Sequence, residues 1–145
     1  MKISLASDHG GLALKNAIKQ HLVELGHTVT DYGTTTTDSC DYPDYARPAA
    51  QAVASGQADR GIVVCTTGIG VSMTANKVKG VRCALCVSVD MAQMTRHHND
   101  ANVLALGQKY LDTATALQIV DAFITTPFDG GRHQIRVDKI EGEGK

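Results

Sequence analysis

The sequence predicts a single α/β domain, a Rossmann-like three-layer sandwich in which helices cover both faces of a five-stranded parallel sheet. Two observations lead to this prediction. Short runs rich in Ile, Val and Leu alternate with longer amphipathic stretches, the pattern of a parallel sheet whose strands are joined by helices. The chain has 145 residues, the usual size of one domain, and shows no internal repeat or Pro/Gly/Ser-rich linker. We therefore expect one domain over residues 1–145.

Five apolar runs have the length and composition of strands. Each is followed by a polar or glycine-rich connection, and together they account for the expected sheet. They are Lys2–Ala6, His27–Asp31, Gly61–Cys65, Val81–Val87 and Asn102–Leu106.

Helical periodicity fills the stretches between these runs. After the first strand Leu14, Ile18 and Leu22 recur at helical spacing, and Gly26 stands where a helix C-cap is expected. A long polar connection is expected at Thr34–Tyr45 and a frayed tail at 141–145. Further helices are expected at Tyr45–Ala54, Val71–Lys77, Asp90–Arg96 and Thr113–Thr125, with a short last helix opening at Gly130.

Composition narrows the class of partner. The chain carries 14 basic and 15 acidic residues without a polybasic tail or acidic block, so we expect no nucleic acid and no membrane as main partner, but a small ligand. No apolar run approaches the roughly 20 residues that span a bilayer, and no signal peptide is evident. We expect a cytoplasmic protein, in which the four cysteines are thiols rather than disulfides.

Ligands of open parallel sheets bind beyond the carboxyl ends of the strands, so the loops that follow strands are searched first. The first strand leads into Asp8, His9 and two glycines, which suits a polar or anionic ligand. Equally, Asp8 could serve only as a helix N-cap and the glycines only as a turn. This loop alone does not decide between the two.

The third strand ends at Cys65, which is followed by two threonines and the Gly68-Ile69-Gly70 turn. A thiol titrates at about pH 8.5, but a helix N-terminus stabilises the thiolate, so Cys65 could act as a base. The alternative is an inert buried thiol. The segment is neither a Walker A motif nor an arginine-containing phosphatase loop, and it lacks the third glycine of a dinucleotide fingerprint. No nicotinamide cofactor is expected.

Two later segments carry further candidates. His97 and His98 follow the fourth helical stretch, where an imidazole could exchange protons with a sugar oxygen, or could simply favour a helix C-terminus. A metal site using both histidines and Cys65 lacks compact ligand spacing, so no metal is expected. Arg132 and Arg136 share one helix face and suit a phosphate, although such a pair could also be a solvated surface.

The remaining cysteines give no chemistry by themselves. Cys83 and Cys86 have redox-motif spacing but lie in a predicted strand, where residues three apart point to opposite faces, so both are expected in the core. Cys40 is a loop thiol to which no role is assigned.

Taken in order, these segments resemble the ribose-5-phosphate isomerase B family, whose relatives act on allose and galactose 6-phosphates. The resemblance runs almost end to end. It is carried by Ser-Asp-His-Gly-Gly at 7–11, Asp-Tyr-Pro at 41–43, Cys-Thr-Thr-Gly-Ile-Gly at 65–70, Ala-Asn-Lys at 75–77, His-Asn-Asp at 98–100 and Gly-Gly-Arg-His-Gln at 130–134.

The resemblance implies an aldose–ketose isomerase of ribose 5-phosphate and ribulose 5-phosphate that needs no cofactor. Cys65 corresponds to the proton-transferring base and His98 to the group that opens the sugar ring. Thr67, with the backbone amides of the loop, corresponds to the cradle of the enediolate. The substrate-binding positions implied are Asp8, His9, Thr66, Gly68, Ile69, Gly70, Asn99, Lys109, Arg132 and Arg136.

The resemblance also implies a homodimer or homotetramer with the site at the subunit interface. Two departures are expected to matter: Thr66 stands where the family commonly has glycine, and Lys109 where an arginine is often found, which keeps the charge but loses the bidentate fork. Another sugar phosphate, such as allose 6-phosphate, galactose 6-phosphate or a tetrulose phosphate, remains open as substrate. So do a silent sugar-phosphate-binding subunit and a metal-dependent hydrolase.

Overall fold

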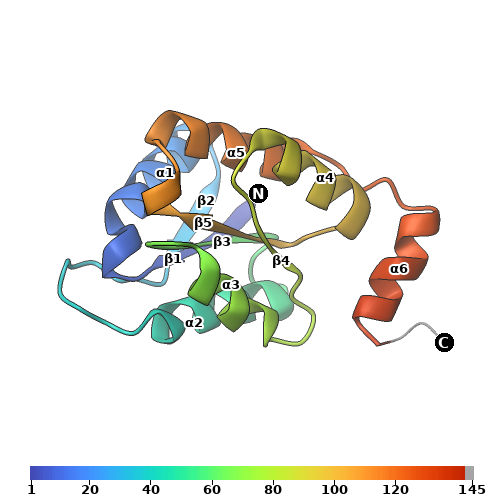
Figure 1. Cartoon of the computed structure of the whole chain (residues 1–145), viewed down its shortest axis with the longest axis horizontal. Helices are drawn as coiled ribbons and strands as arrows, with labels where there is room; N and C mark the ends of the chain where they lie inside the picture. Colours follow the sequence, from blue (N-terminus) through green and yellow to red (C-terminus); the bar gives the residue numbers. More distant parts are fainter. Residues whose placement is uncertain (143–145) are drawn as a thin grey trace.

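The computed structural model describes residues 1–142 as an α/β sandwich built on one sheet. All four strand pairings are parallel, and the strand order is β2-β1-β3-β5-β4 (Figure 1). The predicted fold class is confirmed. The strands are β1 Lys2–Ser7, β2 Thr28–Asp31, β3 Arg60–Cys65, β4 Cys83–Leu85 and β5 Val103–Gly107.

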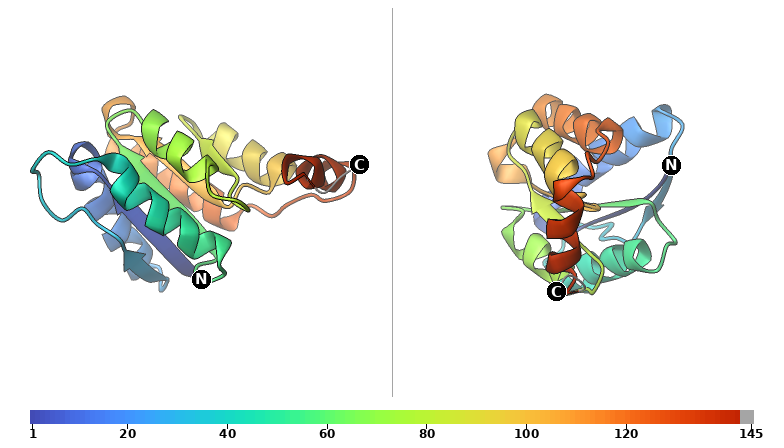
Figure 2. Two further views of the ribbon diagram at one scale, coloured as in Figure 1. Left: turned by 90° about the horizontal axis from the view of Figure 1, so that it is seen from below. Right: turned by 90° about the vertical axis from the view of Figure 1, so that its right-hand side faces the viewer.

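Helices cover both faces of the sheet (Figures 1 and 2). One face is covered by α1 (Leu12–Glu24), α4 (Val89–Asn99) and α5 (Thr113–Thr125), and the other by α2 (Tyr42–Ala54) and α3 (Ile69–Asn76). Short 3-10 turns, η1 (His9–Gly11) and η2 (Gln108–Tyr110), follow β1 and β5. The last helix, α6 (Arg132–Ile140), stands beside the sandwich near the end of α4 rather than on either layer.

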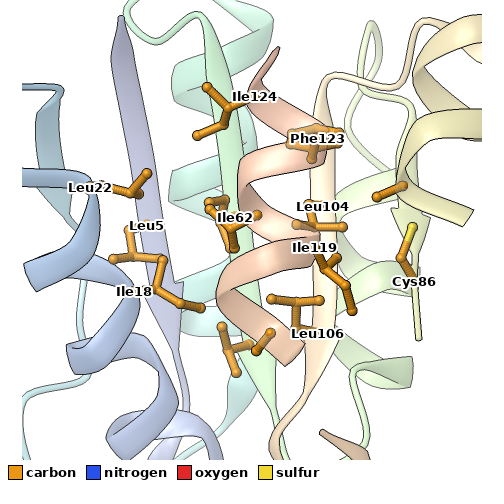
Figure 3. Packing of buried hydrophobic residues seen from close by; sticks show 14 of the residues in the cluster. Leu5, Ile18, Leu22, Ile62, Cys86, Leu104, Leu106, Ile119, Phe123 and Ile124 are labelled. Atoms are coloured by element: carbon orange, nitrogen blue, oxygen red, sulfur yellow. The ribbon is translucent and has the colours of Figure 1, made fainter. Parts of the chain in front are cut away.

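The alternation of side chains along the strands builds two cores of different character. Leu5, Ile62 and Leu104 face α1 and α5, where large aliphatic side chains and Phe123 fill the space (Figure 3). On the other face the residues are small, and the buried part of α2 is mostly alanine. Alanines let α2 lie close to β1, and Ser4 Oγ on β1 donates a hydrogen bond of 2.8 Å to the carbonyl of Ala49.

Several element boundaries differ from the sequence-based expectations, and three of the differences bear on the site or have a local cause. Helix α2 begins at Tyr42, three residues early, because Asp41 takes an extended cap conformation and Pro43 occupies the first turn. Strand β4 covers only 83–85, since the amide of Arg82 bonds the side chain of Asn102 instead of continuing the ladder. Helix α4 runs to Asn99, so the histidines lie in its last turn and not after it.

The connection after β2 is held by a buried lysine. Lys15 in α1 is fully buried, and its Nζ donates to the Asp31 carboxylate at 2.8 Å and to the carbonyl of Thr34. This pair ties α1 to the end of β2 and to the start of the long loop that leads to α2. The loop therefore has a fixed starting point at the carboxyl edge of the sheet.

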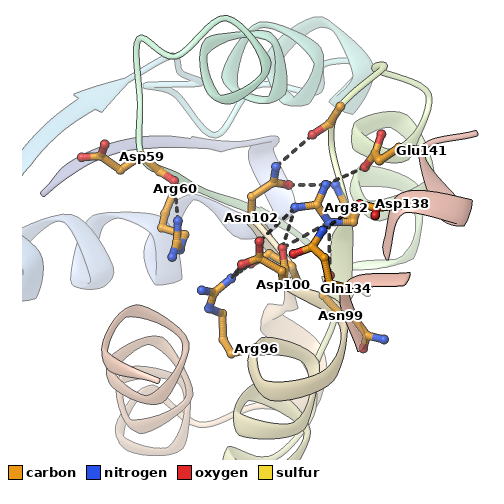
Figure 4. Close-up of polar contacts among 12 residues, drawn as sticks. Asp59, Arg60, Arg82, Arg96, Asn99, Asp100, Asn102, Gln134, Asp138 and Glu141 are labelled. Atoms are coloured by element: carbon orange, nitrogen blue, oxygen red, sulfur yellow. Dashed lines mark hydrogen bonds and ion pairs between the residues drawn. The ribbon is translucent and has the colours of Figure 1, made fainter. Parts of the chain in front are cut away.

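At the opposite edge of the sheet, two arginines join α4, β4 and α6 (Figure 4). Arg96 is buried and donates to Asp100 Oδ1 at 2.7 Å and to the carbonyl of Ala101 at 2.6 Å. Arg82 donates to the carbonyl of Asp100 and, at 2.5 Å, to Glu141 just beyond α6. Of the expected tail, Glu141 is thus anchored, and 143–145 lie outside the described residues.

Among residues 1–142, no helix combines the length and the apolar character needed to traverse a lipid bilayer.

Candidate active site

Cys65 is the last residue of β3 and lies at the wall of a cavity of about 440 Å³ at the carboxyl edge of the sheet. Its side chain is almost fully enclosed, and the amide of Gly68 donates a hydrogen bond of 3.1 Å to its Sγ. This hydrogen bond fixes the position of the sulfur at the wall of the cavity. The cavity is lined by Asp8, Tyr42, Cys65, Thr66, Thr67, Ile69, Gly70 and Met73.

Close backbone contacts give the loop after Cys65 its shape. Gly68 has a φ of 77°, and a Cβ added there would lie 2.8 Å from the carbonyl carbon of Leu106. A Cβ on Gly107 would lie 2.4 Å from the carbonyl oxygen of Thr67. The end of β5 and the loop 66–68 therefore pack backbone against backbone. This packing fixes the loop in the conformation in which the Gly68 amide reaches Sγ of Cys65.

Asp8 both caps the turn η1 and lines the cavity. Its Oδ1 accepts hydrogen bonds from the amides of Gly10 at 2.9 Å and Gly11 at 3.2 Å, as the N-cap interpretation expects. The hydroxyl of Thr66 lies 2.1 Å from where a Cβ of Gly10 would be. The glycine turn is thus held against the loop that carries Cys65, and Asp8 is kept at the cavity rim by that contact.

His9 borders a second, adjoining cavity of about 470 Å³ that also includes Asp8 and Tyr42. Its Nδ1 accepts a hydrogen bond of 3.2 Å from the amide of Cys40, whose sulfur lies 3.8 Å away. A neutral ring whose Nδ1 accepts carries its proton on Nε2, which can then donate to a ligand. Cys40, which had no expected role, fixes this tautomer through its backbone.

Two residues complete the carboxyl edge. Lys109 in η2 donates its amide to the carbonyl of Thr66 at 2.9 Å, and its ammonium lies 5.9 Å from the ring of Tyr110. Tyr42 appeared in the sequence analysis only within a motif. Its ring packs against Gly70, where an added Cβ would lie 2.5 Å from the Cζ atom of the ring. A Pro at the next position signals a helix start, and this was the available clue to Tyr42. The structure thus brings Asp8, His9, Lys109 and the whole segment Cys65–Gly70 together.

The other predicted site residues lie at the amino edge of the sheet. His98 and Asn99 end α4, and Arg132 and Arg136 lie on α6 beside it. The ring of His98 stacks on that of His133, with centroids 4.6 Å apart and planes 15° apart. Partial burial, with the charges of His98, Arg132 and Arg136, lowers the pKa of His133. His133 was missed because it stood within a motif that was read for its arginines.

The two groups are separated by the length of the sheet. The six residues of β3 span about 20 Å at about 3.3 Å per residue, which is longer than an extended pentose phosphate. Within one chain, His98 and the arginines therefore cannot touch a ligand held at Cys65, and a metal ion cannot be shared by His97, His98 and Cys65. A cavity of about 580 Å³ at the amino edge, between α4, α6 and the loop after α3, is not lined by Cys65.

Cys83 and Cys86 lie in the two cores on opposite faces of the sheet, as their spacing predicts. Burial raises the pKa of both thiols, that of Cys86 to about 11. Neither thiol is poised for redox chemistry at neutral pH.

Comparison with known proteins identifies the family to which this fold belongs. Ribose-5-phosphate isomerase B of Escherichia coli is 47% identical over 139 residues, covering 96% of this chain and 93% of that protein. The structure of ribose-5-phosphate isomerase B from Clostridium thermocellum superposes with a TM-score of 0.97 at 51% identity, covering 98% of this chain and 96% of that one. The enzyme from Mycoplasma genitalium with bound ribulose-5-phosphate gives a TM-score of 0.94 at 45% identity, over 97% and 94% of the two chains. Residues 3–140 match the family described as Ribose/Galactose Isomerase, and the chain belongs to that family.

Proposed function

We propose that this chain is an aldose–ketose isomerase that interconverts ribose 5-phosphate and ribulose 5-phosphate by proton transfer through Cys65. One observation carries the proposal: Cys65 is enclosed at the wall of a cavity at the carboxyl edge, and its Sγ accepts a hydrogen bond from the Gly68 amide. A relative of nearly equal length carries this activity in its name, and one neighbouring structure holds the product ketose phosphate.

In the proposed mechanism the Cys65 thiolate removes the proton on the second carbon of the linear aldose. The electron pair moves toward the carbonyl oxygen and gives an enediolate. The protonated thiol then returns the proton to the first carbon, while the hydroxyl proton on the second-carbon oxygen moves to the oxygen of the first carbon, so that the carbonyl lies at the second carbon. Thr67 and the amides of Gly68, Ile69 and Gly70 would hold the developing negative charge. The first turn of α3 adds the positive end of a helix dipole on the same side, which favours the thiolate. No cofactor is needed for these steps.

The second half of the site is proposed to come from another copy of the chain. His98 of one subunit would open the sugar ring bound at Cys65 of its partner, with Asn99 binding hydroxyls and Arg132 and Arg136 holding the phosphate. On the Cys65 side, Asp8, His9, Thr66 and Lys109 would bind the remaining polar groups of the substrate.

Exposed apolar side chains at both edges support a homodimer. Met73 and Ile69 beside the Cys65 cavity are 64% and 44% exposed, and Ile135 and Ile140 on α6 are 59% and 61% exposed. Large apolar side chains gathered at two surfaces indicate protein contacts. A dimer that pairs these surfaces would cover them and bring the two half-sites together, and two such dimers would give a tetramer.

Such an enzyme would serve the pentose phosphate pathway. A cytoplasmic location is proposed with it, because all four cysteines are free thiols in the structure.

The decisive experiment measures specificity constants of the purified chain for ribose 5-phosphate, allose 6-phosphate and galactose 6-phosphate, with and without a chelator. We expect the pentose phosphate to be preferred and the rate to survive chelation. Preference for a hexose phosphate would change the substrate, inactivity of the chain alone would favour a binding subunit, and loss of activity on chelation would favour a metal enzyme.

The role of Cys65 is tested by Cys65→Ala. Removal of a general base typically costs about 10²–10⁴-fold in rate, so turnover should fall by at least that factor while the circular dichroism spectrum is unchanged. Cys83→Ala is the matched control, since that thiol packs against the core beneath α2 and α3 and is not among the proposed site residues. In deuterated water the wild-type product should gain deuterium, which a hydride shift would not give. Near-normal turnover in Cys65→Ala would refute the assignment.

A further inference from the structure

Three side chains that commonly ligate metals converge at the amino edge. They are His98 at the end of α4, Asp129 in the loop before α6, and His133 in the first turn of α6, and their ligand atoms all lie within 4.8 Å of one another. Sequence spacing did not find this set, because His98 is separated from the other two by the whole of α5. The set contains no cysteine and is distinct from the one weighed from the sequence.

Hydrogen bonds hold Asp129 and the turn before His133 in place, and His98 is held against His133 by ring stacking. The amide of Asp129 donates to the carbonyl of His97 at 3.1 Å, and Asp129 Oδ1 pairs with His97 Nδ1 at 2.7 Å. The amide of His133 donates to the carbonyl of Gly130 at 3.0 Å, which orders the turn that opens α6. The carboxylate is thus oriented by an outer histidine, as ligating carboxylates commonly are. The loop that carries it is fixed to the end of α4.

Two imidazole nitrogens and one carboxylate oxygen form a ligand set that suits zinc, and sites with three protein ligands keep a fourth position open for water or substrate. Imidazole-rich sets select zinc, copper and nickel over magnesium and manganese. The stacked rings of His98 and His133 set their edges side by side, so small rotations about the side-chain bonds can turn one nitrogen of each toward Asp129. Arg132 and Arg136 nearby oppose a cation, which argues for binding weaker than that of a structural zinc site.

We propose that His98, Asp129 and His133 form a regulatory binding site for Zn²⁺ and that the bound ion inhibits the enzyme. Inhibition rests on the proposed function, because a ligated His98 can no longer exchange a proton with the sugar ring. The ion would also place a positive charge where the free enzyme presents an imidazole. Removal of the ion by a chelator would restore activity.

Binding is tested without reference to activity, by competition for Zn²⁺ between the full-length chain and a chromophoric chelator. We expect one ion per chain for the wild type, for Cys65→Ala, which removes the enclosed thiol, and for His21→Asn. His21 is the matched control because it pairs with Asp121 at 2.7 Å, a histidine–carboxylate pair without a third ligand. His133→Asn and Asp129→Ala should each lose this ion. Retention in both, loss in Cys65→Ala, or no binding to the wild type would overturn the proposal.

Inhibition is measured for each variant relative to its own rate in the presence of a chelator. The wild type should be inhibited by Zn²⁺ at the concentrations that fill the site, and Mg²⁺ at the same concentrations should have no effect. His133→Asn should require at least tenfold more Zn²⁺ for the same fractional inhibition. Equal sensitivity of His133→Asn and wild type would show that the ion inhibits elsewhere and refute the regulatory role. Failure of the proposed isomerase activity would leave the binding experiment intact, so the two failures are distinguishable.

Discussion

Two inactive variants of this chain should restore each other's activity if the site is shared between subunits. The structure places Cys65 at the carboxyl edge and Arg132 and Arg136 near the amino edge, separated by about 20 Å along β3. Cys65→Ala removes one half of the proposed site, and Arg132→Ala/Arg136→Ala removes the other. The arginines are exposed, so their removal leaves the core untouched.

The size of the recovery follows from counting sites. Random pairing of equal amounts of the two variants puts about half of the chains into mixed dimers, and each mixed dimer contains one intact site and one site with both defects. About a quarter of all sites are then intact, so the mixture should show about a quarter of the wild-type rate. A tetramer built from two such dimers gives the same fraction, because each site involves only two chains.

The assay mixes the variants in denaturant, refolds them together and measures isomerisation at a ribose 5-phosphate concentration well below the wild-type KM. The control pairs Cys65→Ala with a triple variant that combines Cys65→Ala with Arg132→Ala and Arg136→Ala. Neither chain then supplies Cys65, so no pairing of the two produces an intact site. A mixture no more active than the mean of its parents would refute the shared site, provided that wild type refolds to full activity under the same conditions.

Three further outcomes are expected. Arg136→Ala should mainly raise KM for the phosphorylated sugar in initial-rate measurements, and unchanged kinetics would move the phosphate site elsewhere. Asp31→Ala leaves the buried Lys15 ammonium without its carboxylate partner and should lower the free energy of urea unfolding by about 3–5 kcal/mol. Lys19→Ala removes only the exposed partner of Asp31 and should lower this free energy by less than about 1 kcal/mol. Burial raises the pKa of Asp31, but the hydrogen bonds from Lys15 and the Gly33 amide outweigh it, and the pKa is lowered from its ordinary 3.8. This stabilisation is therefore complete above about pH 4 and is lost as the pH falls through the lowered pKa, which unfolding at stepped acidic pH will show. Thr66→Gly should raise the specificity constant for hexose phosphates relative to ribose 5-phosphate, because Thr66 lines the Cys65 cavity.

The sheet and its carboxyl-edge loops could be predicted from the sequence because their signals are local. The apolar runs have the period of strands, and Cys65 is followed after two threonines by the Gly68-Ile69-Gly70 turn, in which Gly68 lies close to the backbone of β5. The predicted range of strand β4 was too long, because the apolar run continues to Val87 although the chain has already left the sheet. The start of α2 was missed because the polar residues before Tyr45 resemble a loop, although Pro43 marks the first turn of the helix.

Features that depend on distant partners could not be predicted in this way. Lys15 follows helical spacing and would be taken for a solvent-exposed charge, and only the tertiary fold shows that Asp31 and the carbonyl of Thr34 satisfy it in the interior. Likewise, His133 meets His98 only because α5 carries the chain back along the sheet. Residue spacing alone likewise does not show that a single chain divides the predicted residues between two edges of the sheet; only the family resemblance implied a site at a subunit interface.

The glycines around Cys65 also determine where evolution can alter this site. A methyl group at Gly68, Gly107 or Gly11 would lie 2.9 Å or less from backbone atoms, so no residue larger than glycine fits at these positions. Lys109 and Thr66 are joined by a backbone hydrogen bond that does not depend on their side chains, and the Thr66 side chain packs against Gly10 through its hydroxyl and not against a backbone carbonyl. Descendants of this chain that acquire other sugar phosphates should therefore have diverged at Thr66 and Lys109 while the glycine framework stayed the same, a pattern that deep mutational scanning would reproduce in the laboratory.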